Sequence, residues 1–222
     1  MGIRKMNYFF VFFLFAAMIG ASGCSSVVDP VPPSPQPVMN VADYYLPLTN
    51  VGASYAYCVK TSTGADTILM TMQGRDANTA VMPSGQLCYS TDLTRSTYRL
   101  FSYYYSMNDS EAYTLGKISC GSPDQYWLDL KAPLMVGQTW KFNNNNGSSY
   151  VTSFYTAKVT RRGATMKMPD GTIYNDVAEI IYTSSAGDST VKWFARGTGL
   201  LYSTTKQPNS DFGQEMRLVG VN

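Results

Sequence analysis

Apolar and polar residues alternate along much of the chain after residue 41. The alternation is clearest in four runs, at residues 68–72, 151–159, 178–182 and 191–195. Successive side chains of a strand point to opposite faces of a sheet, so a period of two indicates half-buried strands. No long stretch repeats apolar residues at helical spacing. The pattern predicts a mainly β domain with an antiparallel sheet. We expect this sheet to curve into a half-barrel or a barrel-like shape. The alternative is a β-sandwich.

Turn signals separate the predicted strands. Glycine stands beside Asn, Asp, Thr, Ser or Gln between the alternating runs. Glycine and these polar residues favour the backbone angles of tight turns. Asp170-Gly171, which lies between two β-rich runs, predicts a two-residue hairpin loop.

Two segments of the chain share one pattern. Residues 47–57 read PLTNVGASYAY, and residues 133–142 read PLMVGQTWKF. Each has Pro-Leu, a short spacer, Val-Gly, two further residues and then two aromatic residues in alternation. Proline ends the preceding run, glycine permits a tight reversal, and aromatic residues two positions apart share one face of a strand. We expect two similar halves, each opening with a turn that begins a strand.

The first 23 residues have the layout of a secretory signal peptide. Arg4 and Lys5 precede an uninterrupted apolar run at residues 8–19, and small residues follow. As a helix this run would extend about 18 Å, which is too short to cross a hydrocarbon core of about 30 Å. Such a segment is removed on export and is excluded from the fold.

The residues Ala21-Ser22-Gly23-Cys24 resemble the lipobox of bacterial lipoproteins. In that family the cysteine is acylated and becomes the first residue of the mature chain. The resemblance implies diacylglyceryl and palmitate groups on Cys24, and Ser25 after it implies an outer-membrane destination. Two or more acyl chains hold a protein stably at a membrane, whereas one chain holds it only marginally. The alternative is an ordinary signal peptide that is cleaved nearby and leaves Cys24 as a free thiol.

A proline-rich segment follows the predicted acylation site. Five prolines lie between Pro30 and Pro37. Proline removes backbone donors and favours polyproline II, so this segment reads as a semi-rigid spacer. The sequence therefore divides into a signal peptide at 1–23, an acylated cysteine with its tether at 24–40, and a single β domain at 41–222.

The β domain carries three motifs with a known counterpart. They are the Val-Gly-x-x-Trp segment at 133–140, the turn MPDGT at 168–172 and the strand end WFARGTGL at 193–200. Together they resemble the "PLxVGxxW" and "wfapGvGlv" motifs of secreted bacterial proteins, mostly lipoproteins of uncharacterised function. Asp170 and Arg196 stand where that family has a small residue and a proline. The resemblance implies a β-rich envelope domain and no catalytic residues.

Charge and composition exclude several functions. All 15 acidic residues follow Cys24 and two of the 17 basic residues precede it, so the mature side chains balance at 15 against 15. Without clustered Lys and Arg, a nucleic-acid partner is not expected. The chain has no histidine. This excludes Ser-His-Asp and Cys-His catalysis, histidine-ligated zinc and the facial iron triad, and we expect no metal or cofactor.

Carboxylates are the remaining catalytic possibility. A glycan hydrolase needs two facing carboxyl groups about 5–9.5 Å apart, and the sequence leaves that alternative open. Glu179 interrupts an apolar strand, which the outward face of a half-solvated strand explains more simply. Most aspartates stand beside Gly, Asn or Ser, where turns account for them.

Three cysteines follow Cys24, namely Cys58, Cys88 and Cys120. An exported protein meets an oxidising compartment, where one disulfide and one remaining thiol are expected. Cys120 lies in a Gly/Ser turn and Cys88 follows a loop, which favours Cys88–Cys120 over Cys58–Cys88. Buried, unpaired thiols are the alternative.

Aromatic residues are abundant, with 17 Tyr, 10 Phe and three Trp. Tyr103-Tyr104-Tyr105 places rings on both faces of one strand, and Tyr98 lies shortly before it. Tyrosine combines an apolar body with a polar rim and is enriched at binding surfaces. We take Tyr98, Tyr103 and Tyr105 as candidates for a binding face for a sugar or peptide, or for a lipid cavity inside a half-open barrel. The alternative is ordinary use of tyrosine in core and sheet edges.

The sequence predicts a lipid-anchored protein of the bacterial cell envelope whose β domain is not an enzyme. It touches the membrane through its amino-terminal lipid and binds a protein, glycan or lipid partner. The alternative function is a carboxylate-dependent glycan hydrolase.

Overall fold

The computed structural model describes residues 40–75, 87–95, 98–116, 126–144, 153–206 and 213–222. The chain divides into two compact units, Met1–Pro37 and Val38–Asn222, and the first unit lies outside the described residues. The signal peptide, the acylation of Cys24 and the tether therefore stay predictions. Everything below concerns the second unit.

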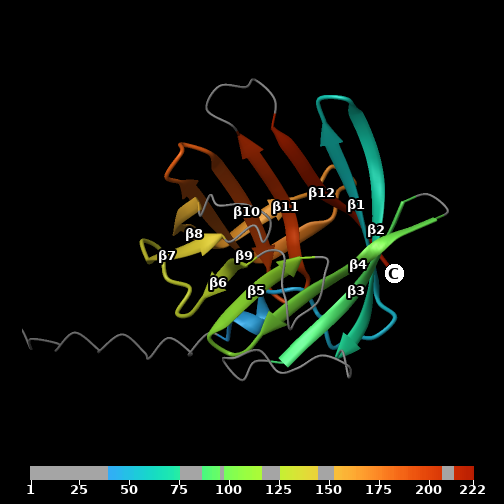
Figure 1. The fold of residues 1–222 in the computed structure, drawn as a ribbon, viewed down its shortest axis with the longest axis horizontal. Helices are drawn as coiled ribbons and strands as arrows, with labels where there is room; N and C mark the ends of the chain where they lie inside the picture. Colours follow the sequence, from blue (N-terminus) through green and yellow to red (C-terminus); the bar gives the residue numbers. More distant parts are fainter. Residues whose placement is uncertain (1–39, 76–86, 96–97, 117–125, 145–152, 207–212) are drawn as a thin grey trace, which may run out of the picture. The chain divides into compact units, whose positions relative to one another are not determined.

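The second unit is built around one antiparallel sheet of twelve strands. Each strand pairs with its neighbours in sequence, except that β1 pairs with β12 while β6 and β7 form the two edges (Figure 1). The first six strands are β1 (Ser54–Thr61), β2 (Gly64–Arg75), β3 (Leu87–Arg95), β4 (Tyr98–Met107), β5 (Glu111–Gly116) and β6 (Trp127–Lys131). The last six are β7 (Thr139–Asn144), β8 (Ser153–Lys167), β9 (Ile173–Ser184), β10 (Ser189–Ala195), β11 (Gly199–Lys206) and β12 (Gln214–Val221).

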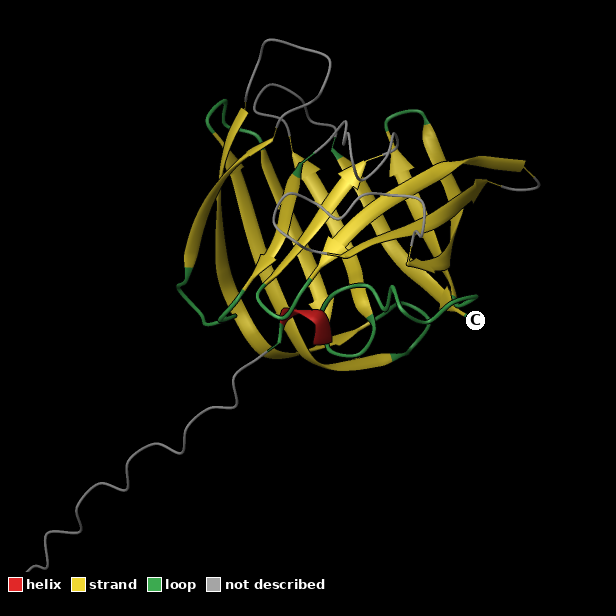
Figure 2. Cartoon of the chain, turned by 60° about the horizontal axis from the view of Figure 1, so that its bottom comes forward, coloured by secondary structure: helices red, strands yellow, loops and turns green. Residues whose placement is uncertain are grey.

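The sheet curls into a nearly closed barrel (Figure 2). This confirms the mainly β, antiparallel, barrel-like prediction, and the β-sandwich alternative is wrong because all twelve strands belong to one sheet. The predicted Asp170-Gly171 hairpin exists between β8 and β9. Its loop is longer than two residues, because the Met168 amide donates to Thr172 O and the Gly171 amide donates to Met168 O.

The seam between β6 and β7 is closed by side chains instead of a backbone ladder. The Trp140 indole N–H donates to Leu128 O at 3.4 Å, and the Gln138 amide group donates to Ala132 O at 3.2 Å. The rings of Trp127 on β6 and Phe142 on β7 meet edge to face with their centroids 5.1 Å apart. These contacts satisfy carbonyls of the β6 edge that have no strand beside them.

Each half of the barrel begins with the same turn, as the repeated sequence pattern predicts. The Gly52 amide donates to Met72 O at 2.9 Å, and the Gly137 amide donates to Val159 O at 2.8 Å. Gly52 and Gly137 have φ angles of 86° and 91°, a region that residues with a Cβ rarely adopt. The two halves are thus two six-stranded meanders, β1–β6 and β7–β12, that start in equivalent ways.

The side chains of the two turns match as well. Val51 and Val136, which precede the glycines, are 67% and 64% exposed. Tyr55 and Trp140, the first aromatic residues of β1 and β7, are both buried. The turn therefore points an apolar side chain outward and delivers an aromatic ring to the barrel interior.

A short segment at residues 41–48, which we call the plug segment, fills one end of the barrel. It begins with the 3-10 helix η1 (Val41–Asp43), which lies within the ring of strand ends in Figure 2. The Val41 amide donates to Asp109 O at 3.1 Å, and the Gly197 amide donates to Asp43 O at 2.7 Å. The segment is therefore tied to the β4–β5 turn on one side and the β10–β11 turn on the other.

The plug segment is held mainly by apolar burial. Its buried side chains are Val41, Tyr44, Tyr45, Leu46 and Leu48. Burial of a side chain of this kind contributes about 2 kcal/mol relative to exposure. A Cβ at Gly199 would lie 3.0 Å from Tyr45 O and from Leu46 Cα, so glycine permits the close approach of the plug segment to β11.

The antiparallel order defines the two ends of the barrel. Strands alternate in direction, so odd-numbered strands begin and even-numbered strands end at the end that holds the plug segment. We call this the plug end, and the opposite one the far end.

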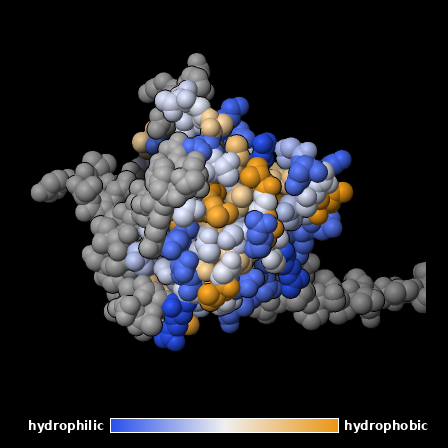
Figure 3. All heavy atoms as spheres, turned by 90° about the vertical axis from the view of Figure 1, so that its right-hand side faces the viewer, coloured by the Kyte–Doolittle hydropathy of each residue, from blue (hydrophilic) through white to orange (hydrophobic). Residues whose placement is uncertain are grey.

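On the outer surface seen in Figure 3, apolar side chains form separate patches among polar ones. Among the described residues, no helix is long and apolar enough to cross a membrane.

Candidate functional site

The interior of the barrel contains a cavity of about 520 Å³. Tyr45 and Leu46 of the plug segment line it at the plug end. Its walls come from strands of both halves of the barrel, including β2, β4, β6, β10 and β12. This volume falls in the range of ordinary small-molecule sites.

The cavity wall changes in character along the barrel axis. Toward the plug end it is lined by Leu46, Phe194 and Leu200, which are buried and apolar. Toward the far end the polar side chains of Asp188, Thr190, Thr205 and Gln214 share the wall with the aromatic rings of Trp127 and Tyr155. The cavity wall is thus apolar at the plug end and mixes polar and aromatic groups at the far end.

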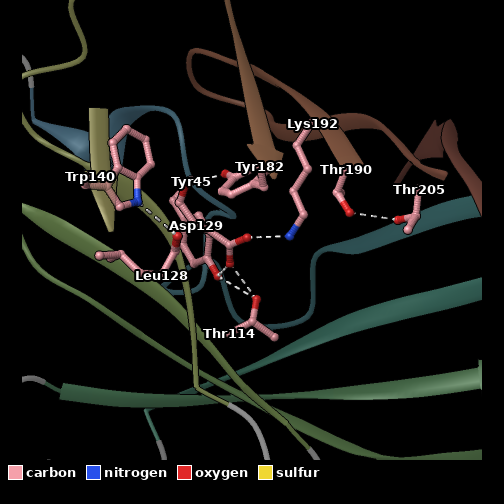
Figure 4. Close-up of polar contacts among 9 residues, drawn as sticks. All are labelled: Tyr45, Thr114, Leu128, Asp129, Trp140, Tyr182, Thr190, Lys192 and Thr205. Atoms are coloured by element: carbon pink, nitrogen blue, oxygen red, sulfur yellow. Dashed lines mark hydrogen bonds and ion pairs between the residues drawn. The ribbon is translucent and has the colours of Figure 1, made fainter. Parts of the chain in front are cut away.

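Asp129 lies at mid-height in the cavity wall and is almost fully buried, at 2% side-chain exposure. Its Oδ2 accepts hydrogen bonds from the Tyr45 hydroxyl at 2.8 Å and the Thr114 hydroxyl at 2.6 Å. Its Oδ1 pairs with the Lys192 ammonium at 2.5 Å (Figure 4). Buried charges persist in proteins when they are paired and hydrogen-bonded in this way.

These contacts join four separate parts of the chain. Tyr45 comes from the plug segment, Thr114 from β5, Asp129 from β6 and Lys192 from β10. Tyr182 on β9 adds a fifth, because its hydroxyl donates to Asp129 O. The network therefore ties the plug segment to both halves of the barrel beside the seam.

Both members of the ion pair line the cavity, and Lys192 is the more exposed of the two. Its side chain is 17% exposed, and its Nζ lies 5.0 Å from the ring centroid of Trp127 and 5.5 Å from that of Tyr182. An ammonium has three donors, and Asp129 accepts one of them. The group at mid-cavity that a ligand meets is therefore a cation framed by aromatic faces.

Burial alters the acidity of the tyrosines around this network. Removal from water, and then the negative charge of Asp129, raise the pKa of Tyr45 well above its ordinary value. The same two causes raise the pKa of Tyr182. Both phenols stay protonated at neutral pH, so they act as hydrogen-bond donors to Asp129.

Trp127 is the cavity residue with an unused donor. It is 7% exposed, and its indole Nε1 is buried without a hydrogen-bond partner. Its ring packs against Tyr155 with the centroids 4.7 Å apart. An unpaired buried donor carries a desolvation cost. A hydrogen-bond acceptor on a ligand would offset this cost if the Trp127 ring turned its N–H toward the ligand.

The sequence-predicted tyrosines fall partly in this cavity. Tyr103 and Tyr105 on β4 both line it, and their ring centroids are 5.5 Å apart. Tyr104, between them, faces the other side of the strand. The side chain of Tyr98 lies outside the described residues. Two of the three candidates are thus brought together, inside the barrel and away from its outer surface.

The cysteines are only partly described. Cys58 is free and Cys88 is disulfide-bonded. Cys120 lies outside the described residues, so the Cys88–Cys120 pairing stays a prediction. Cys88 is buried at the start of β3 and does not line the cavity.

Sequence reasoning missed Tyr45, Asp129 and Lys192. The alternation in β10 placed Val191 and Trp193 on one face and Lys192 on the other, without saying which face was inside. The structure turns Thr190, Lys192 and Phe194 inward and leaves Val191 and Trp193 partly exposed. One signal was present in the sequence, because Asp129 stands between Leu128 and Leu130 in the short strand Trp127–Lys131.

The carboxylate of Glu179 lies outside the cavity and has structural partners. Glu179 accepts from the Thr160 hydroxyl at 2.5 Å and lies 3.8 Å from Arg161. It does not line the cavity, in agreement with an outward position on β9. Within the described ranges, no group of three or more Cys, Asp or Glu residues could hold a metal ion.

No protein-family model and no curated protein matches the sequence. Solved structures with a similar arrangement include a candidate lipoprotein from Parabacteroides distasonis, with a TM-score of 0.47 and 8% identity. The match covers 84% of this chain and 100% of that one. A candidate exported protein with a YmcC-like fold from Bacteroides fragilis has a TM-score of 0.46 and 11% identity, over 83% and 99% of the two chains. Similarity at this level assigns no function.

Proposed function

We propose that this protein is a lipid-anchored component of the bacterial cell envelope that binds a small amphipathic molecule inside its barrel and does not transform it. The observation that carries the proposal is the cavity of about 520 Å³, whose wall combines apolar and aromatic side chains with a small number of polar groups at mid-height and toward the far end. Sites for small molecules combine mainly apolar walls with a few well-placed polar groups. This cavity has that composition.

The wall predicts how the ligand lies. An apolar portion would contact Leu46, Phe194 and Leu200 beside the plug segment. A hydrogen-bond acceptor farther along the ligand would meet the Lys192 ammonium, whose partner Asp129 leaves donors unused. Polar groups at the outer end would contact Thr190 and Thr205, whose hydroxyls lie 3.1 Å apart.

The contacts of Asp129 support binding over glycan hydrolysis. Asp129 and Asp188 are the carboxylates that line the cavity among the described residues. Both oxygens of Asp129 already accept hydrogen bonds, from Lys192, Tyr45 and Thr114. A catalytic carboxylate must instead meet the glycosidic oxygen or the sugar ring. Hydrolysis is the competing outcome of the experiment below.

The place of action rests on the amino terminus. A lipobox-like sequence ending in Cys24 supports an acyl anchor, and Ser25 supports the outer membrane as its destination. Mass spectrometry of the amino-terminal peptide from the native host tests this part directly. Two or three acyl chains on Cys24 are expected, and an unmodified thiol would refute the anchor.

Ligand binding is tested with a fluorescent single-chain amphiphile and two neighbouring substitutions on β11. Ser203→Trp places a large ring in the cavity, whereas Thr204→Trp places the same ring on the opposite face of the strand. We expect Ser203→Trp to weaken probe binding about tenfold or more, since the ring takes up part of a preformed pocket. Thr204→Trp should bind like the unsubstituted protein.

Thermal unfolding of both variants controls for damage to the fold. Equal binding by the two variants, or no binding of any amphiphile by the unsubstituted protein, would refute the proposal. Mass spectrometry of the recovered probe and of glycan substrates separates binding from turnover. Cleavage products that disappear in Asp129→Asn would support the hydrolase instead.

A further inference from the structure

Large apolar side chains are exposed mainly at one end of the barrel. Among the described residues, six such side chains are about half exposed or more. Five of them form a set that we call the apolar rim: Val51, Met135, Val136, Ile173 and Val221, with exposures between 48% and 67%. The sixth is Phe154, at 59%.

Strand direction places the apolar rim at the plug end. Val51 precedes β1, Met135 and Val136 precede β7, Ile173 is the first residue of β9, and Val221 is the last residue of β12. Odd-numbered strands begin and even-numbered strands end at the plug end, so all five positions lie there. Phe154 is the second residue of β8 and lies at the far end.

The chain also enters the barrel at the plug end. Asn40, the first described residue, donates a hydrogen bond to Asp109 Oδ1 at 2.7 Å in the β4–β5 turn. The 16 residues at 24–39, which connect the predicted acylated cysteine to Asn40, therefore join the barrel at the plug end, the end that carries the apolar rim. A membrane anchor on this tether lets this end of the barrel reach the lipid surface.

Charges of both signs lie at the plug end. Arg196 lies 3.0 Å from Asp43 and Lys131 lies 2.9 Å from Glu111, and Arg75, Lys167 and Asp170 are exposed at the same end. This mixture gives the rim no single sign of charge that would require or repel an anionic membrane. An attraction between the rim and lipid would therefore come from apolar contact and not from charge.

We propose that the apolar rim rests on the lipid surface of the membrane that holds the anchor. The proposal rests on the lipid anchor of the proposed function and adds an orientation to it. Apolar side chains at an interface gain free energy when they enter the boundary between head groups and acyl chains. The tether keeps the rim at a high effective concentration beside the membrane, so a weak affinity is enough.

This orientation assigns the two ends of the barrel to different surroundings. The plug end and its apolar rim face lipid. The far end, where Thr190, Thr205 and Gln214 line the cavity, faces the aqueous compartment. Competing occupants of the rim, a second copy of the chain or another protein, are outcomes of the following test.

The test uses the full-length acylated protein reconstituted in vesicles that contain phospholipids with brominated acyl chains, which quench tryptophan fluorescence on contact. Val136→Trp reports on the apolar rim, and Phe154→Trp is the matched control at the far end. Both positions are exposed to a similar degree, so neither substitution disturbs the core. The fluorescence of the unsubstituted protein comes from Trp127, Trp140 and Trp193 and is the background that is subtracted from that of each variant.

We expect brominated lipid to quench the added fluorescence of Val136→Trp at least about twofold more strongly than that of Phe154→Trp. Equal quenching at both positions, or none at either, overturns the proposal. Protection of Val136→Trp from quenching together with cross-linking between copies also overturns it, in favour of a self-contact. The mass of the acylated protein is checked first, so failure of the anchor and failure of the rim are distinguished.

Discussion

Asp129 and Lys192 carry opposite charges but differ in their access to solvent. The carboxylate is 2% exposed, whereas the lysine side chain is 17% exposed and reaches the cavity. A buried charge that loses its partner costs several kcal/mol, because no water replaces the lost contact. The two ends of this ion pair should therefore respond unequally to substitution.

We expect Lys192→Met to lower the free energy of unfolding by about 3 kcal/mol or more, since it leaves the Asp129 carboxylate unpaired. Asp129→Asn should cost less, because the remaining ammonium can reach water in the cavity. The double substitution should recover part of the loss from Lys192→Met. Urea unfolding measures all three.

The control is Lys131→Met, which removes the more exposed ion pair with Glu111. Exposed pairs contribute about 0–1 kcal/mol. A loss from Lys192→Met as small as that from Lys131→Met would show that Asp129 is not isolated from water.

The repeated turn was the element that the sequence described best. Val-Gly, two further residues and then two alternating aromatic residues predicted both the reversal and that the two rings share one face of the strand. The structure has these features at Gly52 and Gly137, with matching hydrogen bonds. Local patterns of this kind can be read because the backbone conformation depends on a few neighbouring residues.

We expect Gly52→Ala and Gly137→Ala to destabilise the protein by similar amounts, about 1–2 kcal/mol each. Nothing lies within 4 Å of a Cβ built at either position, so the cost comes from the positive φ angle and not from a clash. Urea unfolding measures the loss. Gly220→Ala is the control, because a Cβ there would be in ordinary contact with Ala56 at 3.9 Å. A loss in only one of the turn variants would contradict their equivalence.

At the scale of the whole molecule, the sequence predicted antiparallel strands in a half-barrel or barrel-like sheet, but not which strands pair to join its two halves. Strand pairing between β1 and β12 joins residues far apart in sequence, and no local pattern contains that information. A lipid cavity lined by Tyr103 and Tyr105 was one of the predicted alternatives, but the polar network inside it was missed for the same reason. Tyr45, Thr114, Asp129 and Lys192 lie on four different segments, and their meeting follows from the curvature of the sheet.

Buried tyrosines predict that the whole barrel loses stability in alkali. Burial raises the pKa of Tyr57 and Tyr105 above the ordinary value of 10.0, and raises the pKa of the buried Tyr44 hydroxyl to about 12. A folded-state pKa above the unfolded one gives stability that is complete below pH 10 and falls as the pH rises beyond it. Each such phenol contributes a slope of about 1.4 kcal/mol per pH unit in that window.

Urea unfolding between pH 8 and 12, followed together with phenolate absorbance, checks this expectation. The buried phenols should ionise in the same transition in which the barrel unfolds. A free energy of unfolding that stays constant to pH 12 would contradict it.

The pairing of the first strand with the last has a consequence for the order of assembly. β1 is the first of the twelve strands in sequence and pairs with β12, the last of them. The join between the two meanders can therefore form only after the other eleven strands have been synthesised, although it lies in the middle of the sheet. Loss of β12 would split the barrel into two separate sheets, whereas a cut in the connection between β6 and β7 would interrupt no ladder.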